Sequence, residues 1–121
     1  MASTVFAAKK VMRAHTAQLR LLGVGADASF SLMPGYMLVG MAVENLTANA
    51  VTGNLNLGTT DAGVDVVSGF VVGASAVKHV PEASILLRYW SRSVAQALFL
   101  TSTNWNSASL NVTLLLEKVS P

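Results

Sequence analysis

The chain has 121 residues, of which 52% are hydrophobic and 12% charged, and it contains no cysteine. This length suits one domain whose core is large enough to fold without disulfides, and the lack of cysteine excludes thiolate metal sites and thiol nucleophiles. Gly, Asn, Thr and Ser interrupt every apolar run before the roughly 18 residues that span a bilayer, so no membrane segment is predicted.

Residues 1–15 are predicted to form a basic N-terminal arm. No acid precedes Asp27, whereas the chain before it carries four bases, Lys9, Lys10, Arg13 and Arg20. From Asp27 onward six acids outnumber four bases. A basic arm ahead of a mildly acidic body can dock on an acidic protein surface or on phosphate, and it can equally be a solvated terminus.

The conformation of residues 3–22 is ambiguous in the sequence. Apolar residues and one histidine recur at alternating spacings of three and four, as on one face of a helix: Val5, Ala8, Met12, His15, Leu19 and Leu22. We expect an extended or partly helical arm to about residue 15, then a strand over 18–22. The acid-free composition also fits a transit peptide, against which the strand pattern near Gln18 argues.

The remainder is punctuated like a β protein, with Gly, Pro, Asn and Ser between short apolar or alternating stretches. The predicted strands cover 29–33, 36–45, 51–57, 64–72, 77–80, 84–90, 95–101 and 110–119. Pro34-Gly35 predicts a turn, Gly40 a close approach by a neighbour, Gly69 a bulge, and Pro81 the end of an edge strand. In the last strand one face is expected to carry Leu110, Val112, Leu114 and Leu116.

Strands spaced near ten residues apart, with no long amphipathic helix after residue 22, predict one all-β domain over 16–121. The strand count fits a single-domain antiparallel β-sandwich, jelly-roll-like, with two facing four-stranded sheets and an N-terminal arm. The small share of charge favours a subunit that buries apolar surface against neighbouring chains; the alternative is an unusually apolar monomer.

Few residues are available for catalysis or metal binding. His15 and His79 lack the spacing of a metal site. Asp61 and Asp65 are four apart, but they do not meet the pattern of a calcium-binding loop. We therefore expect no metal and no cofactor.

The remaining enzymatic hypothesis is an enzyme that acts through Asp61, Asp65 or Glu44. Glu44 and Glu82 would form a glycosidase pair only if the fold brought their carboxyl groups within about 5–10 Å of each other. No nucleophile-elbow, phosphate-loop or dinucleotide-binding motif accompanies them. The sequence therefore favours a protein that is not an enzyme.

The strongest binding candidate is an aromatic pair, Tyr89-Trp90, flanked by two arginines. With Trp105 it suggests a stacking platform for sugars or single-stranded nucleic acid, although bases outside the arm are too few for a nucleic-acid groove. Trp and Tyr more often fill a core or a subunit interface. We predict a partner-binding surface made of Lys9, Lys10, Arg13, Arg20, Arg88, Tyr89, Trp90 and Arg92.

Three stretches carry a resemblance to a known class of protein. Residues 43–53 contain Asn-Leu-Thr-Ala-Asn-Ala and end in Thr-Gly, residues 57–67 read Leu-Gly-Thr-Thr-Asp-Ala-Gly-Val-Asp-Val-Val, and Trp105-Asn106-Ser107-Ala108 leads into the last strand. Over about residues 28–118 the chain resembles small virion proteins encoded by tailed phages and prophages. Val64 stands where a threonine is expected.

The resemblance implies a structural particle component located in the virion. The implied role is a capsid decoration (cement) or head-fibre subunit, with a tail, collar or fibre-attachment component as the alternative. Such proteins resemble trimeric jelly rolls on capsid shells, so the implied partners are the chain itself as a homotrimer and the major capsid protein or other virion proteins. A carbohydrate-binding β-sandwich is the alternative of another class.

Overall fold

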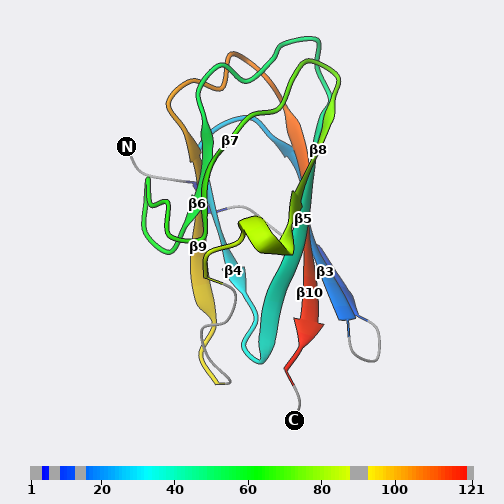
Figure 1. Ribbon diagram of the computed structural model, residues 1–121. Helices are drawn as coiled ribbons and strands as arrows, with labels where there is room; N and C mark the ends of the chain where they lie inside the picture. Colours follow the sequence, from blue (N-terminus) through cyan, green and yellow to red (C-terminus); the bar gives the residue numbers. More distant parts are fainter. Residues whose placement is uncertain (1–3, 6–8, 13–15, 88–92, 120–121) are drawn as a thin grey trace.

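The computed structural model describes residues 4–5, 9–12, 16–87 and 93–119 (Figure 1). Within these ranges the strands are β1 (Thr4–Val5), β2 (Lys9–Met12), β3 (Thr16–Val24), β4 (Ala28–Leu32), β5 (Tyr36–Asn45), β6 (Leu55–Gly58), β7 (Val67–Phe70), β8 (Val77–Pro81), β9 (Gln96–Ser102) and β10 (Leu110–Lys118). A short 3₁₀ helix, η1 (Glu82–Ser84), follows β8. No helix in the described part of the chain has the length and apolar character to span a membrane.

The strands form two sheets that face each other, with β5, β8 and β10 on one side in Figure 1 and β6, β7 and β9 on the other. The β5 sheet has the order β2-β3-β10-β5-β8, and the β9 sheet has the order β1-β4-β9-β6-β7. Strand β3 pairs with β10, β4 with β9, β5 with β8 and β6 with β7, all antiparallel. Over β3–β10 the first strand thus pairs with the last, the second with the second-to-last, and so on inward. This nested pairing is the jelly-roll arrangement, and it confirms the predicted fold class.

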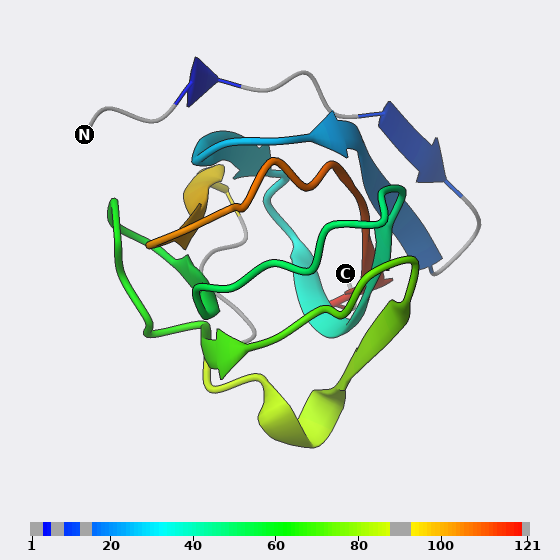
Figure 2. The ribbon, with the colours of Figure 1, turned by 90° about the horizontal axis from the view of Figure 1, so that it is seen from above.

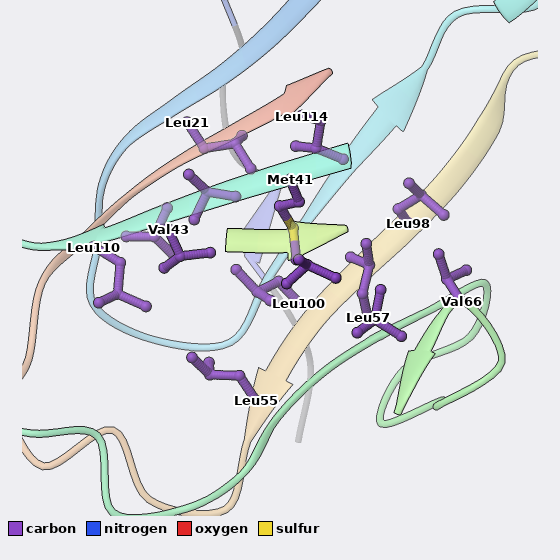
Figure 3. Close-up of a cluster of buried hydrophobic side chains, with 14 of the residues drawn as sticks. Leu21, Met41, Val43, Leu55, Leu57, Val66, Leu98, Leu100, Leu110 and Leu114 are labelled. Carbon is purple, nitrogen blue, oxygen red and sulfur yellow. The ribbon is translucent and has the colours of Figure 1, made fainter. Parts of the chain in front are cut away.

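Inward side chains of the two sheets meet in one hydrophobic core, in which Leu21, Met41 and Leu114 from the β5 sheet face Leu57 and Leu100 from the β9 sheet (Figure 3). The core forms because each strand alternates inward and outward residues. Complete burial of one leucine stabilises the fold by about 1.5–3 kcal/mol relative to leaving it in water.

Strand β10 shows the predicted alternation clearly. Its inward residues, Leu110, Val112, Leu114 and Leu116, are all buried. Leu115, between two of them, points outward, remains 37% exposed and covers Gly40 of β5, where an added Cβ would lie 3.3 Å from a Leu115 methyl carbon. The expected close approach at Gly40 is therefore confirmed.

The predicted bulge lies at Gly69. Leu55 pairs with Phe70 and Leu57 with Val67, so β7 has one more residue than β6 between these pairs. Gly69 adopts a φ of 63°, and its N–H donates to the Asn56 side-chain oxygen at 2.8 Å. A residue with a Cβ is disfavoured at this dihedral, which explains the glycine.

The predicted strand over 84–90 is wrong for residues 84–87. Pro81 ends β8, η1 follows, and the Ile85 N–H donates to the Glu82 carbonyl at 3.0 Å. Ile85 is buried and closes this end of the core. The apolar residues of this segment resemble a strand in the sequence, but only Ile85 is buried, and Leu86 is exposed. Residues 88–90 of that prediction lie outside the described ranges.

Two other predicted strands are shorter than expected. Strand β6 starts at Leu55, because the preceding residues bond to other loops: the Val51 N–H donates to the Val72 carbonyl, and the Gly53 N–H to that of Asn104. Strand β7 is confined to Val67–Phe70, because residues 64–66 form an irregular bend, in which Asp65 accepts the Thr59 N–H.

The described parts of the N-terminal segment are extended. Strand β1 lies parallel to β4 at the edge of the β9 sheet, and β2 lies antiparallel to β3 at the edge of the β5 sheet. Figure 2 shows both on the side of the sandwich opposite β8 and η1. The helical alternative is wrong for β3, where Leu19 is buried and Leu22 is exposed, as a strand requires.

Candidate interaction surfaces

The structure describes three of the eight predicted partner-binding residues. Arg20 is exposed on the outer face of β3, and in register Lys9 pairs with Arg20 and Lys10 with Leu19. The others, Arg13, Arg88, Tyr89, Trp90 and Arg92, lie outside the described residues. The backbone of Lys9 thus lies opposite that of Arg20, and the partner-binding role of these residues and of the aromatic pair stays a prediction.

The outer face of the β5 sheet is a weakly charged surface with small side chains near its centre. One row across it runs through Arg20, Thr113, Ala42 and His79, which are paired in register. A shallow hollow of about 280 Å³ beside this row is lined by Arg20, Ala42, Glu44, Val77, Asn111 and Thr113. Arg20 and Glu44 place opposite charges on its lining.

A second hollow, of about 300 Å³, lies between β7 and β8. These are the last strands of the two sheets, so the hollow marks the side where the sandwich is open. Its lining includes buried Val67, Phe70 and Val80, and exposed Ser68 and Lys78. It therefore combines apolar side chains with a cation.

Several apolar side chains are exposed on the described surface. Leu86 is 68% exposed, Val71 57% and Val77 54%. Val71 and Val77 each line one of the two hollows, and the Leu86 N–H donates to the Val66 carbonyl at 2.8 Å, which holds it beside the end of the loop before β7. In a chain with few charges, such groups are candidates for contact with other proteins.

The loops at one end of the sandwich are held by polar side chains. Asn45 is only 3% exposed and bonds fully: its amide donates to the carbonyls of Asn49 at 2.7 Å and Gly73 at 3.1 Å, and its oxygen accepts from the N–H and hydroxyl of Thr47 at 2.9 and 2.7 Å. The Asn-Leu-Thr-Ala-Asn sequence therefore has a structural role: the hydrogen bonds of Asn45 hold the loop after β5 against the loop that contains Gly73.

Trp105 lies at the same end and is half-buried against the core. Its indole N–H donates to the Asp27 carboxylate at 2.7 Å. A tryptophan held in this way has used its one polar atom inside the protein, so its position does not favour the sugar-stacking hypothesis.

The loop between β6 and β7 explains the Gly-Thr-Thr-Asp-Ala-Gly sequence. The Thr59 hydroxyl and N–H both donate to the Asp65 carboxylate, the latter at 2.8 Å. These bonds, the hydroxyl one above all, lower the pKa of Asp65. A Cβ on Gly58 would lie 2.4 Å from the Gly63 carbonyl carbon, so the loop folds back over a strand end that must be glycine.

The acids do not assemble into a metal or glycosidase site within the described ranges. No group of three or more His, Asp or Glu side chains there lies close enough to hold a metal ion. Glu44 pairs with Val77, and Glu82 follows five residues later. At about 3.3 Å per residue this places their backbones roughly 16 Å apart, so the sheet does not bring the two residues opposite each other.

Sequence reasoning identified 77–80 as an edge strand but did not connect it with a binding surface. The hollow beside it depends on β7, which precedes β8 by several residues and belongs to the other sheet. Only the fold brings these two edges together. Comparison with protein-family models gives no match for this chain, and comparison with curated proteins gives none either.

Proposed function

We propose that this protein is a structural subunit of a tailed-phage virion, most simply a capsid decoration or head-fibre subunit that binds the shell and stabilises it. The observation that carries the proposal is the exposed apolar surface on a jelly roll with few charged residues. Such a surface is expected where a protein is covered by other subunits. The sequence resemblance over residues 28–118 points the same way.

Two surfaces support contacts with other subunits. The outer face of the β5 sheet combines a shallow hollow with Arg20 and Glu44, two opposite charges that suit pairing between copies. Leu86 and Val71 lie elsewhere and are available for a different neighbour. A homotrimer bound to a shell needs two kinds of contact, one between copies and one to the shell.

The mechanism is mechanical. Each contact with a shell subunit removes apolar surface from water, which stabilises by about 25 cal/mol per Å² before the cost of association. Copies that bind across joints between shell subunits hold those subunits together. Because one particle carries many symmetric copies, modest individual contacts add up through multivalency.

The test uses the purified protein and particles of the phage that encodes it. We expect a trimer by light scattering, and we expect retention on particles from which the native copies have been stripped. Val77→Glu should weaken trimer formation, and Leu86→Glu should weaken retention on particles. Thr52→Glu, on an exposed polar loop, is the matched control and should change neither. A monomer that no particle retains would contradict the proposal.

A further inference from the structure

Strand β8 presents unpaired backbone groups along the open side of the β5 sheet. The Asn45 N–H donates to the Ala76 carbonyl at 2.9 Å, and the register continues through the pairs 44–77 to 40–81. Opposite residues of antiparallel strands alternate between bonded and non-bonded pairs. The backbone groups of Lys78 and Val80 therefore point toward β5, and those of Val77 and His79 point away from it. No described strand pairs with β8 on that side.

The hollow between β7 and β8 lies beside this edge. A strand added to β8 would run about 4.8 Å beyond it, across the opening between the two sheets. Half of its side chains would point the same way as Lys78 and Val80, toward the hollow. The buried Val67, Phe70 and Val80 in the lining suit an aliphatic side chain in the roughly 300 Å³ space.

The charge of the edge selects among possible strands. Lys78 and His79 are both exposed on β8, and no acid is among the described residues that line the hollow. The acids on adjoining elements are Glu44, opposite Val77, and Glu82 in η1. Pairing β8 with β8 of another copy would bring Lys78 side chains together, which is unfavourable. The charge at this edge therefore disfavours pairing with β8 of another copy and favours an acidic strand.

We propose that the edge of β8 and the adjoining hollow dock an extended segment of a different protein, in which an acidic and an aliphatic residue stand two positions apart on the same face, as an additional strand of the β5 sheet. Backbone hydrogen bonds to Val77 and His79 hold the segment, Lys78 pairs with its acidic residue, and the hollow receives the aliphatic side chain. This docking site rests on the proposed function for the identity of the partner as a virion protein. Its chemistry is a property of the isolated subunit.

The probe is a short synthetic peptide in which a glutamate and a valine stand two positions apart among threonines (the glutamate–valine peptide). The comparison peptide has lysine in place of the glutamate (the lysine–valine peptide). At saturation the glutamate–valine peptide should slow amide hydrogen exchange of Val77 and His79 by about tenfold or more, as expected when an exposed N–H enters a sheet. NMR shifts should extend to Phe70 and Val80. The lysine–valine peptide should have no such effect.

Lys78→Glu should reverse the preference between the two peptides, whereas Lys118→Glu, on an exposed lysine at the end of β10, should leave it unchanged. His79→Pro removes an N–H that points away from β5, so it should abolish peptide binding. The melting temperature of this variant should show that it is still folded. If that variant unfolds, the charge reversal at Lys78 still decides.

Equal binding of the glutamate–valine peptide to Lys78→Glu, absence of protection at Val77 and His79, or binding mapped elsewhere would each overturn the docking site. Peptide binding by a protein that no particle retains would leave the docking site standing and remove the virion role. Retention on particles without peptide binding would remove the docking site and leave the virion role standing.

Discussion

The indole N–H of Trp105 and the carboxylate of Asp27 join two loops that are 78 residues apart in the chain, through a hydrogen bond of 2.7 Å. Asp27 also accepts the Ser102 N–H at 3.1 Å. The loop between β3 and β4 is thereby fixed to the loop between β9 and β10. This bond orders the end of the sandwich where the Trp-Asn-Ser-Ala sequence turns into the last strand.

Breaking this bond should lower stability. Trp105→Phe removes the only donor of the indole and should reduce the free energy of unfolding by about 1.5–3 kcal/mol, as for other bonds to charged groups. Asp27→Ala should cost a similar amount, and the double variant less than the sum. Urea unfolding of all four proteins measures this coupling. Strictly additive losses would show that the two side chains do not depend on each other.

Asn45 is expected to be the most sensitive polar residue of the described loops. Asn45→Ala removes four side-chain hydrogen bonds from a part-buried place and leaves the Thr47 N–H without a partner, so it should cost about 2–4 kcal/mol. Asn54→Ala, at an exposed position, is the control and should stay within about 0.5 kcal/mol. Thermal unfolding compares the two variants. Equal losses of stability in the two variants would show that the hydrogen bonds of Asn45 do not stabilise these loops.

Adjacent leucines of β10 test the two faces of the β5 sheet. Leu114→Ala leaves a cavity in the core and should reduce the free energy of unfolding by about 2–5 kcal/mol. Leu115→Ala removes a side chain that is 37% exposed and should cost less than about 1.5 kcal/mol. Denaturant titration at one temperature gives both values. A larger loss at Leu115 would mean that Leu115, and not Leu114, faces the core.

The Thr59–Asp65 pair predicts a pH dependence. Because hydrogen bonds from Thr59 lower the pKa of Asp65 in the folded protein, their contribution is present above the unfolded pKa of about 3.9. It is lost as the pH falls through the lower folded pKa. Solvent screens this exposed pair, so the contribution should stay below about 1 kcal/mol.

Melting temperatures of the protein and of Thr59→Val, taken from near-neutral to strongly acidic pH, measure this dependence. The two curves should differ at neutral pH and converge in acid below the unfolded pKa. Thr52→Val, on an exposed loop, should show an offset that does not change with pH. A Thr59→Val difference that grows toward acid would have the wrong sign.

Much of the fold was predictable because strand periodicity is a local property. The alternation in Leu110, Val112, Leu114 and Leu116 fixes which face of β10 is buried, whatever strands lie beside it. The bulge at Gly69 was predictable for the same reason, since only glycine readily adopts its dihedral. The segment after Pro81 was not, because Ile85 is buried from the position that follows a short 3₁₀ helix as well as it would be from a strand.

The candidate surfaces were less predictable than the fold. Arg20 was identified from charge alone, but its position beside Ala42 and Glu44 depends on β10 lying between β3 and β5. The sequence did not identify Lys78 and His79 as binding residues, because the hollow beside them is formed together with β7 of the other sheet.

The all-β class and the small share of charged residues can be read from the sequence, since they follow from composition and from residues close together in the chain. The tertiary structure alone decided which strand edges remain open and which side chains meet across the sheets. Those relations join residues far apart in sequence, and local periodicity contains no information about them.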